Sequence, residues 1–159
     1  MGLNITQTKL KEFGIPDKYI PRSDIKDYNT QLAAQFIQGK INLVVLGEHY
    51  YKKCVRLMRL AFIYNRTKEL KWISQSQITY ELLGNLVANP IDVLALVQLY
   101  NEPAENKKNL TGSLINNILG IGGQVLIGCS DSKSLELSFP YDLDMIETRF
   151  EIWKEKRGK

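Results

Sequence analysis

The sequence has little of what metal and redox sites need. It contains two cysteines, Cys54 and Cys129, which lie far apart without a CxxC motif, and one histidine, His49. This usage predicts free thiols in a reducing, cytoplasmic setting and no metal site. No apolar run approaches the ~20 residues of a membrane span. The polar stretch 1–11 has no signal-peptide core, so we expect no membrane contact.

Composition otherwise describes an ordinary globular chain. The 159 residues are 44% apolar and 24% charged, with a formal net charge of +4. This length suits one domain with a substantial core. We expect a single domain over 1–159, in which 1–38 is a helical extension and 39–159 is the core. Mild basicity permits contact with nucleic acid but is also common on solvated surfaces.

Apolar strands alternate with helical segments from residue 40 onward. The expected strands are Ile41–Leu46, Leu70–Ser74, Ile91–Val97 and Gln124–Cys129, and the expected helices are Tyr50–Tyr64, Ser76–Val87 (with Ser76 as cap), Leu110–Leu119 and Leu143–Lys156. The stretch Asn101–Asn109 is expected to be an exposed polar loop. This alternation predicts an α/β fold, a parallel sheet of at most five strands with helices on both faces.

The segment 41–64 has the local order of a phosphate-binding loop: strand, glycine, helix. On the template G-x-x-x-x-G-K-[ST], Gly47 and Lys53 match. Lys52 replaces the second glycine, and Cys54 replaces the hydroxyl that holds Mg²⁺. Tyr50 and Tyr51 fill the space of a triphosphate, with Glu48 adding negative charge. These changes argue against ordinary nucleotide binding and predict no cofactor.

The strand expected at Ile91–Val97 offers a second test. ATPases of this type end an equivalent strand in an acidic pair that holds Mg²⁺ and activates water. Here Val97 and Gln98 stand at that end, and Asp92 precedes the apolar run. We therefore expect neither hydrolysis nor any other enzymatic activity.

Several segments in order resemble DnaC/DnaI-type replicative helicase loaders and the related IstB transposition ATPases. They begin at Gly14-Ile15-Pro16-Asp17-Lys18-Tyr19, continue through the Gly47 loop and Glu69–Ile73, and close with Ile146-Glu147-Thr148-Arg149-Phe150, which is similar to the family's I-x-S-R-[LF] signature. Arg149-Phe150-Glu151 also resembles DnaA-type initiators of the same AAA+ clade. The resemblance implies an AAA+ core, without the loaders' helicase-binding N-terminal domain or a lid.

The resemblance also implies roles for individual residues. Arg149 occupies the family's arginine-finger position, so we expect it to contact a partner together with Tyr50 and Tyr51. The expected partner is a replicative helicase, a helicase loader or another AAA+ subunit. The chain would then assist or block assembly in replication or mobile-element machinery, without hydrolysing ATP.

Two alternatives remain open. Seven of the 21 basic residues fall between Lys52 and Lys71, and Lys52, Lys53, Arg56 and Arg59 have helical spacing. A single-stranded DNA surface and a solvated helix face both fit this pattern. An atypical ATPase using Lys53 is the other alternative. For Cys54, packing is favoured over nucleophilic chemistry, and for Trp72 and Trp153 a core position is favoured.

Overall fold

The structure is a computed structural model that describes residues 5–16, 31–99 and 103–154. Its centre is a five-stranded sheet in which every pairing is parallel, with the order β2-β3-β4-β1-β5. The strands are β1 (Asn42–Leu46), β2 (Leu70–Ser74), β3 (Val93–Val97), β4 (Gln124–Cys129) and β5 (Phe150–Lys154). The predicted α/β class and parallel sheet are confirmed.

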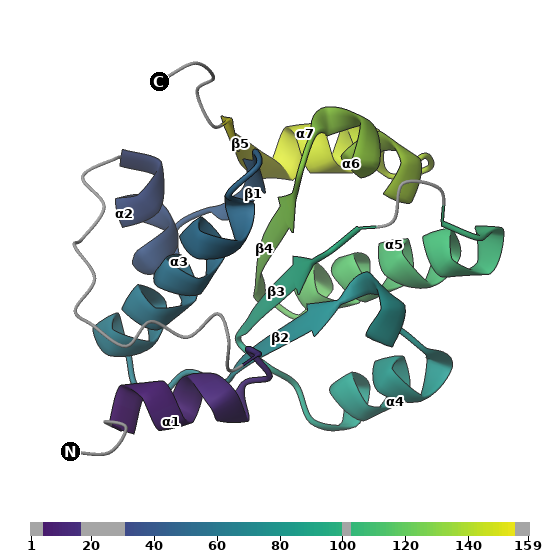
Figure 1. The fold of residues 1–159 in the computed structure, drawn as a ribbon. Coiled ribbons are helices and arrows are strands. Elements are labelled where there is room, and N and C mark those ends of the chain that lie inside the picture. The colour runs from purple at the N-terminus through teal and green to yellow at the C-terminus, as the bar shows by residue number, and fades with distance from the viewer. Residues whose placement is uncertain (1–4, 17–30, 100–102, 155–159) are drawn as a thin grey trace.

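Helices cover both faces of this sheet (Figure 1). One face carries α1 (Ile5–Glu12), α2 (Gln31–Ile37) and α3 (Tyr50–Tyr64), and the other carries α4 (Tyr80–Ala88), α5 (Glu105–Gly120), α6 (Ser132–Ser138) and α7 (Leu143–Arg149). Because strands β1, β3 and β4 are covered on both sides, they are almost entirely apolar and buried.

The last predicted helix is wrong over its second half. Helix α7 ends at Arg149, and Phe150–Lys154 forms strand β5 along β1 instead. The residues of β5 alternate: Phe150 is buried among the α4–α7 side chains, whereas Trp153 packs on the α1–α3 side. Pairing with β1 gives hydrogen-bond partners to backbone groups at the edge of that strand, which a continued helix would leave unpaired. This tertiary pairing outweighs the helical period of the sequence.

Three further expectations differ in detail. Ser76 lies in a short 3-10 turn (Gln75–Gln77), and α4 begins later, with the Thr79 hydroxyl as its cap accepting from the Leu82 amide at 3.1 Å. Helix α5 begins at Glu105, so five of the nine residues of the expected loop 101–109 are helical, and residues 101 and 102 lie outside the described ranges. Helix α6 was not predicted, although Asp131 caps it by accepting from the Ser134 amide at 2.9 Å.

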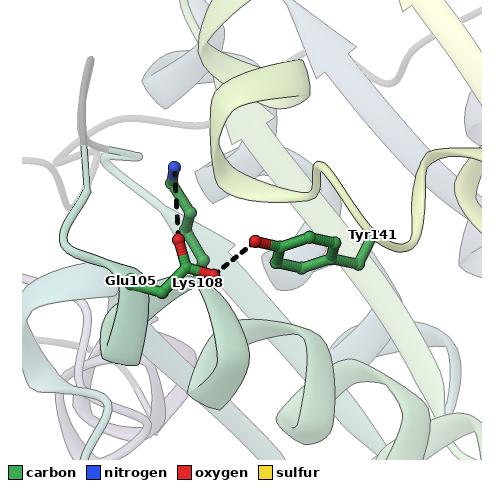
Figure 2. A network of polar contacts seen from close by, with 3 residues as sticks. All are labelled: Glu105, Lys108 and Tyr141. Carbon is green, nitrogen blue, oxygen red and sulfur yellow. Dashed lines mark hydrogen bonds and ion pairs between the residues drawn. The ribbon is translucent and has the colours of Figure 1, made fainter.

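Polar contacts fasten the segments on the α5 side. The Tyr141 hydroxyl, between α6 and α7, donates to the Glu105 carboxylate in the first turn of α5 (Figure 2). Lys108 lies 4.0 Å from the same carboxylate. The hydrogen bond from Tyr141 to Glu105 raises the pKa of the exposed Tyr141 hydroxyl.

On the opposite face of the sheet, the side-chain amide of Gln124 donates to the Phe36 and Ile41 carbonyls at 2.8 and 2.7 Å. These hydrogen bonds connect α2 to strand β4.

Candidate functional site

Ligands of parallel α/β sheets bind beyond the carboxyl ends of the strands, where neighbouring connections diverge to opposite faces. In this chain that point lies between β1, followed by α3 on one face, and β4, followed by α6 on the other. The predicted loop residues are at this point. Gly47 has φ +147°, and its amide donates to the Cys129 carbonyl at 3.2 Å, which joins the two strand ends.

The connection from β1 to α3 is shorter than a phosphate loop. Only Gly47, Glu48 and His49 separate the two elements, because α3 begins at Tyr50. The Tyr50 amide donates to the Gly47 carbonyl at 3.3 Å, closing the turn. The phosphate-loop template needs a non-helical backbone as far as position 52, where its second glycine belongs. Here Lys52 is already within the helix.

Side chains of α3 pack tightly against the end of β4. A Cβ atom added at Gly128 would lie 2.6 Å from the Cys54 sulfur and 2.8 Å from Cδ1 of Tyr50. The Tyr50 ring is buried and stacks on Tyr51, with ring centroids 4.5 Å apart. Gly128 is therefore the residue that lets Tyr50 and Cys54 approach the sheet, a role that sequence reasoning missed because no local signal distinguishes this glycine.

Burial controls the ionisation of this cluster. It raises the pKa of the Tyr50 hydroxyl, with a further contribution from the hydrogen bond to Tyr51. Burial also raises the pKa of the Cys54 thiol, and this effect is larger than the lowering by the nearby Lys53. For Cys129, burial raises the pKa of the thiol to about 12. Both thiols are therefore neutral at physiological pH, and Cys54 is a packing residue, as favoured from the sequence.

The end of β3 has no carboxylate within it. Val97 is buried, and Gln98 leaves the strand with φ +56°, a left-handed conformation that is uncommon for a side chain of this size. Asp92 lies at the opposite end, where its carboxylate accepts from the Glu69 amide at 2.8 Å. Asp92 thus links the starts of β2 and β3 and does not face the β1–β4 end.

The predicted basic residues share helix α3 but differ in exposure. Lys52 is exposed, whereas Lys53, Arg56 and Arg59 are half-buried. The Lys53 ammonium lies 5.6 Å from the ring centroid of Trp153, which is half-buried on β5. Sequence reasoning did not find this contact because it placed Trp153 on a helix and not on a strand beside β1.

The predicted partner residues are in different environments. Arg149, the last residue of α7, is exposed. Its backbone carbonyl accepts from the side-chain amide of Asn42 at 3.4 Å, where β1 and β5 begin. Tyr51 is half-buried. Tyr50 is buried, so its expected contact with a partner is not supported by its position.

Among the residues that the structure describes, no three His, Cys, Asp or Glu side chains gather as a metal site would require. Within the same ranges, no helix combines the length and apolar character needed to cross a bilayer.

The fold is that of a P-loop NTPase-like α/β core, and it is similar to solved structures of DnaA. An AMPPCP-bound DnaA from Aquifex aeolicus matches with a TM-score of 0.63 and 12% identity, covering 91% of this chain and 52% of that one. A replication initiator DnaA bound to AMPPCP and single-stranded DNA matches with a TM-score of 0.62 and 14% identity, with the same coverage. This chain therefore spans about half the length of these DnaA chains. No family model matches the sequence, and no curated protein does.

Proposed function

We propose that this chain is a non-hydrolysing AAA+-like partner protein of DNA replication or mobile-element machinery. It would bind a replicative helicase, a helicase loader or another AAA+ subunit and thereby assist or block assembly. The observation that carries the proposal is the packing of Tyr50 and Cys54 on Gly128, at the strand end where nucleotides bind in AAA+ folds. The fold is retained, while Tyr50 and Cys54 fill the space between α3 and the end of β4.

Three further features support the absence of hydrolysis. The loop after β1 is three residues long, so it lacks the extended row of backbone amides that cradles phosphates. Cys54 is a buried neutral thiol, a poor ligand for Mg²⁺. Gln98 stands at the end of β3, where the family's acidic residues hold the metal and activate water.

Calorimetry with ATP and Mg²⁺ tests the proposed loss of nucleotide binding. We expect no affinity better than about 1 mM, equivalent to about −4 kcal/mol. Tighter binding that Lys53→Ala abolishes would favour the alternative, an atypical ATPase.

Arg149 provides the test of partner binding. Its exposure at the end of α7 leaves the guanidinium accessible to a neighbouring subunit. Surface plasmon resonance should detect association of this chain with the purified replicative helicase or helicase loader of the same organism. Arg149→Ala should weaken it by about tenfold or more, as expected for an interfacial arginine. Lys133→Ala, which removes an exposed cation from α6, is the matched control. Absence of binding to both proteins would contradict the proposed partners.

A second candidate function is single-stranded DNA binding along α3. It is favoured by the basic residues of that helix and by the solved DnaA complex that contains single-stranded DNA. Fluorescence anisotropy with an oligo-dT strand should then show affinity that falls steeply with added salt. The double charge reversal Arg56→Glu and Arg59→Glu should abolish it, whereas salt-independent or absent binding would exclude this candidate.

A further inference from the structure

The turn between α3 and β2 carries an exposed aromatic ring next to cationic side chains. Tyr64, the last residue of α3, is 60% exposed. Arg66 and Thr67 follow it in the turn and are also exposed, and Lys68 is half-buried. An exposed ring flanked by cations is the arrangement with which proteins hold unpaired bases and their phosphates.

Hydrogen bonds of Asn65 fix the shape of this turn. The Asn65 amide donates to the Ala61 carbonyl at 3.1 Å and so ends the helix. The Asn65 side-chain oxygen accepts from the Thr67 amide at 3.1 Å and from the Thr67 hydroxyl at 2.6 Å, and the Lys68 amide donates to the Asn65 carbonyl at 3.3 Å. A turn that is already ordered loses little conformational entropy when a ligand binds to it.

Arg66 is oriented by an aromatic contact. Its guanidinium carbon lies 5.6 Å from the ring centroid of Phe62, which is buried. The Phe62 ring in turn meets the Phe13 ring edge to face, with centroids 5.5 Å apart. Stacking on a ring uses the face of the guanidinium, so the N–H groups at its rim stay directed outward, as contact with a phosphate requires.

A second basic segment meets the turn at Gly39. A Cβ atom added at Gly39 would lie 2.9 Å from the Lys68 ammonium, so the ammonium lies against this glycine. Gly39 has φ +79° and ends α2: the Gly39 and Lys40 amides donate to the Phe36 and Gln35 carbonyls, each at 2.9 Å. The exposed Lys40 follows directly, so cations from two distant segments lie at one place.

Positive charge on this surface is in excess. The stretch 59–68 contains Arg59, Arg66 and Lys68 and no acidic residue. Within the described ranges, no ion pair joins Lys40, Arg66 or Lys68 to a carboxylate. The C-terminal end of α2 attracts a cation and accounts for the position of Lys68. It does not account for the two further cations and the exposed ring beside them, which suit a polyanion that has aromatic groups.

We propose that the α3–β2 turn binds single-stranded DNA, with Tyr64 stacked on a base and with Arg66 and Lys68 in contact with phosphates. Lys40 supplies a further phosphate contact. The proposal rests on the second candidate function and assigns it a surface that sequence reasoning did not single out. Helix α3 has 15 residues, about 22 Å, and separates this turn from the Gly47 loop at the other end of the sheet (Figure 1).

Fluorescence anisotropy with a labelled oligo-dT strand at several salt concentrations tests the two kinds of contact separately. Tyr64→Ala should weaken binding by about tenfold or more and leave the salt dependence unchanged, because stacking releases no counterions. The double variant Arg66→Gln and Lys68→Gln should weaken binding and also reduce the slope of log K against log salt by about 1.4, since each phosphate contact contributes about 0.7 for a single strand.

Matched controls come from the other face of the sheet. Tyr80→Ala removes an exposed tyrosine from α4, and Lys133→Gln removes an exposed cation from α6. Neither should change the affinity or the salt dependence. Tyr64→Phe keeps the ring and should bind as the wild type does. Far-UV circular dichroism and melting temperature verify that each variant is folded.

Photocross-linking tests the stacked base directly. A dT strand with one 5-iodouracil joins covalently to an aromatic side chain that lies on that base under ultraviolet light. Mass spectrometry of the digested complex should find the cross-link on the peptide that contains Tyr64, and Tyr64→Ala should remove it.

The outcomes separate this surface from the candidate function on which it rests. A wild-type chain that binds the strand while the Tyr64 and Arg66/Lys68 variants bind equally well would overturn the surface and leave binding along α3 in place. Absence of binding at low salt would overturn both. Equal affinity for polyglutamate, together with no effect of Tyr64→Ala, would show a surface for polyanions in general and would overturn base stacking.

Discussion

Cys54 and Cys129 illustrate how burial decides the chemistry of single residues at the strand ends. From the sequence, Cys54 was favoured as a packing residue, although two lysines precede it and a cation beside a thiol stabilises its thiolate. In the structure the pKa of this thiol is raised instead, mainly by desolvation, and that of Cys129 is raised to about 12. The free-energy penalty for desolvating a thiolate in a buried site is larger than the stabilisation that a nearby lysine provides.

These raised pKa values predict a loss of stability at alkaline pH. Between the ordinary thiol pKa of about 8.5 and the raised values, the unfolded chain releases protons that the folded chain retains. The stabilising effect is thus fully present below about pH 8.5 and is lost as pH rises. Urea unfolding at several pH values from about 7 to about 10 should show a falling midpoint. Cys54→Ala should reduce the slope, and an unchanged slope in this variant would contradict the burial effect.

Gln98 predicts a stabilising substitution. Its φ of +56° is unfavourable for any residue with a Cβ atom. Gln98→Gly should raise the free energy of unfolding by about 0.5–1 kcal/mol, after allowing for the greater entropy of glycine in the unfolded chain. Urea denaturation measures this difference, and Gln98→Ala, which keeps the Cβ atom, should show no comparable gain. A destabilised glycine variant would indicate that the amide side chain makes a necessary contact.

At the scale of elements, the packing of α3 on β4 predicts a sensitive position. Gly128→Ala places a Cβ atom against the Cys54 sulfur and the Tyr50 ring, so it should lower the free energy of unfolding by about 1–3 kcal/mol. In a Cys54→Ala background the same substitution should cost less, because the sulfur is absent. A double-mutant cycle by chemical denaturation checks this coupling. Additive effects would mean that Cys54 does not limit the space beside Gly128.

The elements that the sequence predicted well are those with one dominant local signal. Strands β1, β3 and β4 are short apolar runs bounded by turns, and α3 has a strong helical period. Strand β5 was missed because Ile146, Phe150 and Trp153 also fit a helical period. Whether this segment forms a helix or a strand is decided by its pairing with β1, which lies more than 100 residues earlier in the sequence.

In the candidate site too, features with a local signal were predicted and features that depend on long-range contacts were not. The replacements at Lys52 and Cys54 were predicted by comparison with the phosphate-loop motif. The contact of Tyr50 with Gly128 and that of Lys53 with Trp153 depend on long-range pairing and were not readable. The sequence pattern also does not predict how exposed a side chain is. For this reason Tyr50 was expected at a partner surface, although it is buried.

At the scale of the whole molecule, the N-terminal helices form one side of the core. Leu10, Ile15, Ala33 and Phe36 are buried in the same cluster as Leu57 and other α3 side chains. The Gln124 hydrogen bonds to the Phe36 and Ile41 carbonyls fasten this layer to β4. The region 1–38 was expected to be an extension of a core over 39–159. Its described helices instead pack against α3 and contribute buried side chains to the core on that face of the sheet.

Removal of residues 1–38 should therefore prevent cooperative folding of 39–159. Three large buried side chains, each worth about 1.5–3 kcal/mol, would be lost against a typical total stability of about 5–15 kcal/mol. The fragment should bind the dye ANS and lack a sharp thermal transition in near-UV circular dichroism. Phe36→Ala, which should cost about 3–5 kcal/mol in the full chain, provides a finer measurement of the same layer. A fragment 39–159 that unfolds cooperatively near the full-length melting temperature would instead make the N-terminal helices an independent addition to a self-sufficient core.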